Sequence, residues 1–327
     1  MNFRRFFDEA KRDPRRIVFA EPMDERTLSA IAIIQRERLA VPILIGEPDD
    51  IRRRAESLGA DIGDVAIVPV SDARRERFAH EYCKRRDVSD SVAERLIAKP
   101  LYFGGMMVSL GDADGMLSGA ISTTASVIKA AAMTVGMREG FTHPFAYMAL
   151  LIPDLLGETD KLFFFADAAV TISPNTEELA AIGVAVAQAV RTEFNIEPMV
   201  AFLSYSTRGS GQGASVDIVR DAVERAKNMA PDVAIDGELQ LDAAIIPEVA
   251  ERKAKDSPVA GRANVLVFPD LDAGNIGYKI AQYMSGGHAY GPVLIGLKKP
   301  VNDMSRGVSV EDIVGTAVIT VLQAQHV

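Results

Sequence analysis

The feature that most constrains the fold is an alternation of short apolar runs with longer amphipathic segments. Most of the runs end in a polar, glycine or proline loop, and each has the length of a buried strand. They are residues 16–22, 41–46, 65–70, 161–167, 199–205, 263–270 and 291–297. Between such runs, residues 24–39 and 214–230 place apolar side chains at helical spacing. This alternation predicts an α/β protein with largely parallel sheets, whose ligands bind in the loops that follow the strands.

Composition narrows the classes of protein to which the chain can belong. Its 327 residues suffice for two domains. The sequence shows no internal repeat, and no flexible linker marks a boundary between domains. The net charge of −9 argues against nucleic-acid and membrane partners, and an anionic ligand would need a local basic pocket. Cys83 is the only cysteine, and the histidines lack metal-ligand spacing, so no metal site is predicted. Residues 1–16 lack an apolar signal core, and we expect a cytoplasmic protein.

The stretch NDMSRGVSVEDI, residues 302–313, has two interpretations. In the first, Ser309 caps a helix and Asp312 occupies its third position, where acidic side chains suit the helix dipole. In the second, Ser305, Arg306 and backbone N–H groups hold a phosphate, and Asp312 lies beside it. The two interpretations are compatible, and this stretch alone does not decide between them.

Two other loop clusters carry hydroxyls, glycines and a cation. Residues 204–215 contain Arg208 and suit either a phosphate cradle or a flexible strand-to-helix loop. Residues 118–136 place hydroxyls before a helix that contains Lys129, and an ordinary capped helix with a surface lysine is the alternative.

Several of these stretches together resemble the phosphate acetyltransferase (phosphotransacetylase) family. The most specific are DGELQLDAA, SPVAG, AGNIGYK and KPVNDMSRG, whereas the first eighty residues match only loosely. The resembling segments are residues 102–130, 165–180, 203–211, 236–282 and 291–307. They cover roughly the final two-thirds of the chain in the family's order.

The resemblance implies reversible acetyl transfer between acetyl phosphate and coenzyme A in acetate metabolism, with inorganic phosphate as the other product. Coenzyme A is then a substrate, and no cofactor is permanently bound. The implied fold is similar to isocitrate and isopropylmalate dehydrogenases, with two α/β domains and the active site in the cleft between them. Domain one would be residues 1–139 plus 295–327, and domain two residues 140–294. A homodimer that forms mainly through the second domains is also implied.

The resemblance also assigns residues. Ser305, Arg306 and Asp312 match the family's catalytic serine, arginine and aspartate. The ligand arginine upstream falls on Arg85, with Arg86 as the alternative. Lys129 stands where the family usually has arginine, so it keeps the charge without the bidentate fork. The predicted substrate-binding residues are Arg85, Lys129, Thr124, Ser126, Ser206 and Asn302.

The implied chemistry is direct attack of the coenzyme A thiolate in a ternary complex, with Asp312 as base. A carboxyl group has a reference pKa of about 4 and a thiol about 8.5, so the base role requires a site that excludes water. In an open site, Asp312 would instead orient Arg306 or cap its helix. Two other functions remain open: butyryl transfer on the same scaffold, and a non-catalytic module that senses acetyl-CoA.

Overall fold

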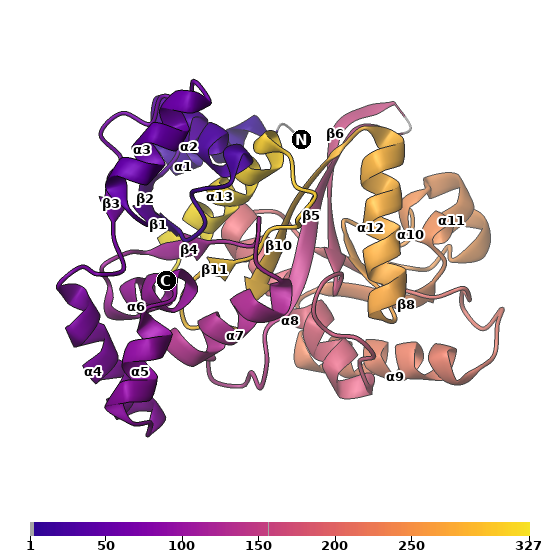
Figure 1. The fold of residues 1–327 in the computed structure, drawn as a ribbon. Coiled ribbons are helices and arrows are strands. Elements are labelled where there is room, and N and C mark those ends of the chain that lie inside the picture. The colour runs from indigo at the N-terminus through magenta and orange to yellow at the C-terminus, as the bar shows by residue number, and fades with distance from the viewer. Residues whose placement is uncertain (1–2, 156) are drawn as a thin grey trace. The chain divides into compact units, whose positions relative to one another are not determined.

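A computed structural model describes residues 3–155 and 157–327 and divides the chain into two compact units (Figure 1). Residues Phe145–Ala289 form most of one, which we call the inserted unit. Residues Arg4–Pro144 and Tyr290–Val327 form the other, which we call the split unit.

The split unit contains a five-stranded sheet in the order β11-β4-β1-β2-β3. Every neighbouring pair of these strands is parallel. From β1 the chain adds β2 and β3 on one side and then returns to place β4 on the other. The strands are β1 (Arg16–Phe19), β2 (Val41–Ile45), β3 (Ala66–Val68), β4 (Gly115–Leu117) and β11 (Val301–Asn302).

Helices connect these parallel strands or flank them along the chain. They are α1 (Arg4–Arg12), α2 (Glu25–Glu37), α3 (Pro48–Ser57), α4 (Arg74–Arg86), α5 (Asp90–Ile97), α6 (Pro100–Leu110), α7 (Thr124–Thr134) and α13 (Val310–Gln325). Helix α13 is buried from Asp312 to Ala324, and for this reason its sequence is apolar nearly all round. The Ser309 hydroxyl accepts a hydrogen bond from the Asp312 backbone N–H at 3.1 Å, which confirms the predicted helix cap.

The inserted unit has its own sheet, whose strands lie in the order β5-β6-β9-β7-β8. The first two residues of β10 (His288–Ile295) also belong to this unit, on the side of β5. Strands β5 and β6 are antiparallel, and the other pairs are parallel. The strands are β5 (Phe145–Leu155), β6 (Glu158–Ala166), β7 (Met199–Leu203), β8 (Ala234–Leu239) and β9 (Val265–Val267). The helices are α8 (Thr176–Phe194), α9 (Ala214–Met229), α10 (Leu241–Ile245), α11 (Pro247–Lys253) and α12 (Leu271–Ser285).

Every apolar run predicted as a strand overlaps one, and the two helices predicted from apolar spacing correspond to α2 and α9. The strands β4, β5, β8 and β11 were not predicted.

Among the described residues, no helix combines the length and the apolar character that a membrane span needs. In the same residues, no three side chains of His, Cys, Asp or Glu gather as a metal site would require.

Candidate functional site

Four loops of the split unit meet at one edge of its sheet. Because β1, β2, β4 and β11 are parallel, the residues that follow each of them emerge at the same end. The order of the strands reverses between β1 and β4, and ligands of open α/β sheets bind at such a point. A ligand-binding site is therefore expected at this edge of the sheet.

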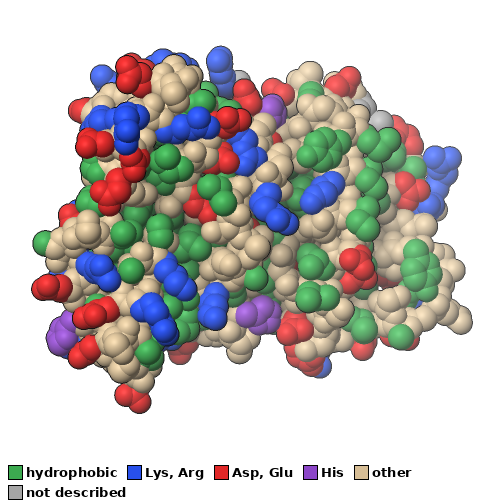
Figure 2. Space-filling model, in the orientation of Figure 1, with side chains coloured by type: hydrophobic (Ala, Val, Ile, Leu, Met, Phe, Trp, Pro, Cys, Tyr) green, Lys and Arg blue, Asp and Glu red, His purple; other side chains and the backbone are tan. Residues whose placement is uncertain are grey.

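A cavity of about 700 Å³ opens at this edge. The loop after β1, the end of β2, the start of α6 and the residues around the start of α7 line it. Its cations are Lys99 and Lys129, both exposed, and Ser122 and Ser126 add hydroxyls. Figure 2 shows lysine and arginine side chains gathered over the region of α6 and α7. The structure thus places Lys129 and Ser126 together, and adds Lys99, which the sequence analysis missed.

The Ser-Arg-Gly turn, residues 305–307, follows β11 at the same edge. The Arg306 side chain is exposed, and no hydrogen bond or ion pair holds its guanidinium within the described part of the chain. The Ser305 hydroxyl accepts a hydrogen bond from the Gly307 backbone N–H at 3.4 Å. Asp312, in the first turn of α13, is 3% exposed. The turn therefore combines a capped helix with an arginine that is available to an anion.

Arg26, on α2, fixes the backbone of this turn. Its guanidinium donates to the carbonyl oxygens of Arg306 at 2.7 Å and Val308 at 3.2 Å. It also donates to the carbonyl oxygen of Ala120 at 3.1 Å, in the loop that leads to α7. Asp24 pairs with the same guanidinium at 2.8 Å. Arg26 therefore links the turn to the loop beside the cavity, a contact across 280 residues that no local motif reveals.

Thr124, the first residue of α7, is engaged with an acid that the sequence analysis did not single out. Its hydroxyl donates to Oδ2 of Asp303 at 2.5 Å. Glu21 holds the loop before α7 by accepting hydrogen bonds from the N–H groups of Gly119, Ile121 and Ser122 at 2.7, 3.2 and 2.7 Å. In this structure, the Thr124 hydroxyl serves to position α7.

Asn302 is completely buried, and its amide is bonded inside the split unit. The amide oxygen accepts a hydrogen bond from the Leu294 N–H at 2.8 Å. The amide nitrogen donates to the Thr320 hydroxyl at 2.9 Å and the Gln323 amide oxygen at 2.7 Å. These bonds anchor the end of β11 to α13, and they leave no amide hydrogen of Asn302 for a ligand.

Arg85 and Arg86 line a different cavity, of about 510 Å³, together with Lys298 and the end of α7. Arg86 donates to the carbonyl oxygens of Ala132 and Met133. Arg85 is exposed and donates to the Ser109 hydroxyl at 2.6 Å. Of the two, Arg85 has the guanidinium that is more accessible to a ligand.

Ser206 lies in the inserted unit, in the loop that follows β7. Its hydroxyl donates to the Glu238 carboxylate at 2.7 Å and accepts from the Gly211 N–H at 2.8 Å. Glu238 also accepts from Gly209 N–H at 2.8 Å and from Arg220 at 3.0 Å. Burial alone would raise the pKa of Glu238, but the hydrogen bonds from Arg220, Gly209 and Ser206 lower it to about 2. Ser206 thus belongs to a buried network that holds its loop.

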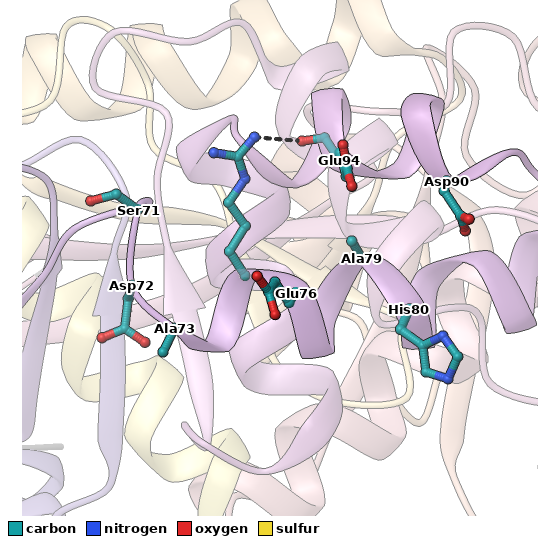
Figure 3. A pocket seen from close by; sticks show the side chains of 9 residues that line it. Ser71, Asp72, Ala73, Glu76, Ala79, His80, Asp90 and Glu94 are labelled. Carbon is teal, nitrogen blue, oxygen red and sulfur yellow. Dashed lines mark hydrogen bonds between the residues drawn. The ribbon is translucent and has the colours of Figure 1, made fainter.

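A further cavity of the split unit, of about 560 Å³, has the opposite electrostatic character (Figure 3). It lies between α4 and α5, and Arg75 in it donates to the Glu94 carbonyl oxygen at 3.3 Å. Its carboxylates are Asp72, Glu76, Asp90 and Glu94. This excess of negative charge disfavours an anionic ligand, so we do not assign the site there.

Comparison with known proteins was made on the sequence and on the fold. The family model described as "Phosphate acetyl/butaryl transferase" matches residues 1–321. A phosphate acetyltransferase from Thermoanaerobacterium thermosaccharolyticum is 45% identical over 322 residues, 97% of this chain and 98% of that protein. A phosphotransacetylase structure from Streptococcus pyogenes has a TM-score of 0.87 at 41% identity and covers 100% of both chains.

A weaker likeness concerns the fold alone. It is to a 4-hydroxythreonine-4-phosphate dehydrogenase from Klebsiella pneumoniae, with a TM-score of 0.56 at 13% identity over 96% of this chain and 100% of that one. The predicted α/β class and its likeness to a dehydrogenase fold are confirmed.

Proposed function

Because the chain belongs to the phosphate acetyl/butaryl transferase family, we propose that it moves an acetyl group between acetyl phosphate and coenzyme A by direct attack of the thiolate in a ternary complex. The activity, phosphate acetyl transfer, is supported by relatives named phosphate acetyltransferase at 40–45% identity. The observation that carries the proposed site is the meeting of the Ser-Arg-Gly turn and the lysine-bearing loops at one edge of a parallel sheet.

In the proposed reaction, the coenzyme A sulfur first bonds to the carbonyl carbon of acetyl phosphate to form a tetrahedral intermediate, and the carbon–oxygen bond to phosphate then breaks. The thiol proton passes to Asp312, and inorganic phosphate leaves. Arg306 matches the charge of the phosphoryl oxygens, and the Ser305 hydroxyl donates to the oxygen that becomes negative in the tetrahedral intermediate. The near-complete burial of Asp312 supports this proposal.

A coupled assay tests the function. The protein, acetyl phosphate and coenzyme A should yield acetyl-CoA, and phosphate with acetyl-CoA should yield the reverse reaction. Butyryl phosphate in place of acetyl phosphate tests the alternative acyl specificity. No transfer with either donor, while acetyl-CoA still binds, would favour the sensing module.

For the ligand contacts, we propose Lys129, Ser126 and Arg85. Lys129 and Ser126 line the cavity at the sheet edge, and Arg85 is the more accessible of the two neighbouring arginines. For Thr124, Asn302 and Ser206 the hydrogen bonds described above support structural roles in place of direct substrate contact.

Replacing Lys129 with alanine is expected to raise the Michaelis constant for acetyl phosphate or coenzyme A about tenfold, the effect of losing one charged hydrogen bond. Turnover should change less, because the proposed contact is made equally in the ground state and the transition state. Steady-state kinetics in both substrates measure this. Lys84→Ala, which removes an exposed lysine paired with Glu81, is the matched control. Unchanged constants in Lys129→Ala would make Lys129 an ordinary surface lysine.

The wider assignments are also proposals. We propose domains of residues 1–139 plus 295–327 and 140–294, which the split and inserted units support with crossings at 144/145 and 289/290. We propose a cytoplasmic location, which a single cysteine fits.

We further propose a homodimer that forms through α12 of the inserted unit. Ile276, Ile280, Tyr283 and Met284 are each more than half exposed and recur at the spacing of one helix face. Figure 2 shows hydrophobic side chains along the position of α12. An exposed apolar stripe of this length is typical of an interface.

The double variant Tyr283→Asp with Met284→Asp places two negative charges on this stripe and is expected to be a monomer at micromolar concentration. A two-fold interface contains each residue twice, so it would bury four unpaired charges and be destabilised. Light scattering after size exclusion measures the mass. Met229→Asp, at an exposed methionine of α9, should leave the mass unchanged. A monomeric parent protein would contradict the proposal.

A further inference from the structure

Asp303 is a fully buried carboxyl group at the edge of the sheet where the site is proposed. It directly follows β11 and precedes Ser305 by two residues. Its Oδ2 accepts the hydrogen bond from the Thr124 hydroxyl, and Thr124 begins the helix that carries Ser126 and Lys129. One side chain therefore joins the segment of the Ser-Arg-Gly turn to the helix that lines the cavity.

The second oxygen of this carboxyl group lacks a partner. Oδ1 of Asp303 is buried and has no hydrogen bond among the described residues. The backbone of Gly119 packs closely against it: a Cβ at that glycine would lie 2.1 Å from Oδ1 and 2.6 Å from the Met304 nitrogen. A negative charge on a buried oxygen without a donor is unfavourable, and protonation removes that charge.

Burial and one neighbouring negative charge favour the protonated form as well. Burial, with a smaller contribution from the charge of Glu21, raises the pKa of Asp303 to about 7, although the hydrogen bond from the Thr124 hydroxyl acts in the opposite direction. Other charged groups on the neighbouring segments include Lys129 on α7, Arg306 in the following turn, the Asp24–Arg26 pair at the start of α2, and Asp312 on α13. Asp303 therefore gains or loses its proton near neutral pH.

We propose that Asp303 is a positioning residue whose protonation favours anion binding: it ties the Ser-Arg-Gly segment to α7, and when ionised its charge opposes a phosphate at that edge. The inference rests on the proposed function, because it takes phosphate to bind beside Ser126, Lys129 and Arg306. Linkage is reciprocal, so phosphate binding draws a proton onto Asp303.

The test compares the dissociation constant of inorganic phosphate for the parent and for Asp303→Asn, by calorimetry from pH 6 to pH 8.5. Asparagine is a neutral isostere that keeps an acceptor for Thr124. The ratio of the parent constant to the variant constant should be near one at pH 6 and rise to roughly tenfold at pH 8.5, the equivalent of a coupled pKa shift of about one unit. The titration of phosphate itself is common to both proteins and cancels in the ratio.

Asp114→Asn is the matched control, since Asp114 lies at the opposite end of the sheet, before β4, in an ion pair with Arg16. Its ratio should not change with pH. Thr124→Val is a second variant, which removes the hydroxyl that lowers the pKa of Asp303 and should move the pH dependence of the phosphate constant above pH 7.

A ratio for Asp303→Asn that stays constant with pH overturns the proposal, as does a Thr124→Val variant whose pH dependence matches the parent's. If Asp303→Asn does not fold, the Thr124→Val result decides. Because calorimetry needs no turnover, a failed acetyl-transfer assay would overturn the proposed function while leaving this test intact.

Discussion

Arg306→Ala is expected to lower kcat/KM for acetyl phosphate by roughly 10² to 10³, the effect of removing one preorganised donor from a developing charge. The Arg306 guanidinium is exposed and makes no hydrogen bond or ion pair within the described residues, so the fold does not depend on it. Its carbonyl oxygen, which Arg26 holds, remains in the variant. Steady-state kinetics measure the loss, and thermal denaturation should show an unchanged melting temperature.

Arg306→Lys separates charge from shape. Lysine keeps the positive charge but not the planar fork, so it should recover only part of the activity. An Arg306→Ala variant with the parent's kcat/KM would remove Arg306 from the mechanism and reduce the Ser-Arg-Gly turn to a helix cap.

Asp312→Asn is expected to lower turnover about thirtyfold at pH 7 and to recover toward pH 9. A thiol with a pKa of about 8.5 is only a few per cent ionised at pH 7, which bounds what deprotonation can contribute. Above that pKa, hydroxide in solution does the same work, so the deficit should shrink. The backbone N–H of residue 312 still donates to Ser309, and the cap survives. A pH–rate profile from pH 6 to pH 9 measures the recovery.

Arg306→Ala provides the comparison, because a charge that stabilises the transition state is needed whatever the state of the thiol. Its deficit should persist at pH 9. Profiles of Asp312→Asn and the parent that differ by one constant factor would reject the base role, and Asp312 would then act as an electrostatic partner of the turn.

The sequence predicted the α/β class because the long apolar runs are strands that are buried within sheets. Three of the four missed strands have physical explanations. Strands β4 and β11 have three and two residues and do not lie in longer apolar runs. Strand β8 contains Asp236 and Glu238, which read as loop residues but are buried beside Arg208 and Arg220. A strand whose acidic residues are buried by ion pairs with other segments lacks the apolar pattern from which a strand is predicted.

For the candidate site too, the sequence predicted the local contacts and not the contacts between distant residues. The cap of Ser309 on Asp312 is local, and the motif predicted it. The partners of Arg26 and Asp303 lie 280 and 179 residues away, so no spacing reveals them. The acid inside the NDMSRG motif was the available signal for Asp303, because strand β11 before it was itself not predicted. The roles assigned to Ser305, Arg306, Asp312 and the ligand residues stay predictions.

The burial of α13 has a consequence for synthesis of the chain. This helix packs against α2, α1, β4 and β1, whose residues are made some 200 or more positions earlier. While the ribosome produces the inserted unit, which can pair its own strands, the early part of the split unit still exposes the apolar surface that α13 later covers. It becomes complete only when residues 310–325 emerge. The split unit, which bears the Ser-Arg-Gly turn, therefore becomes complete after the inserted unit and is the more exposed to chaperones and proteases during synthesis.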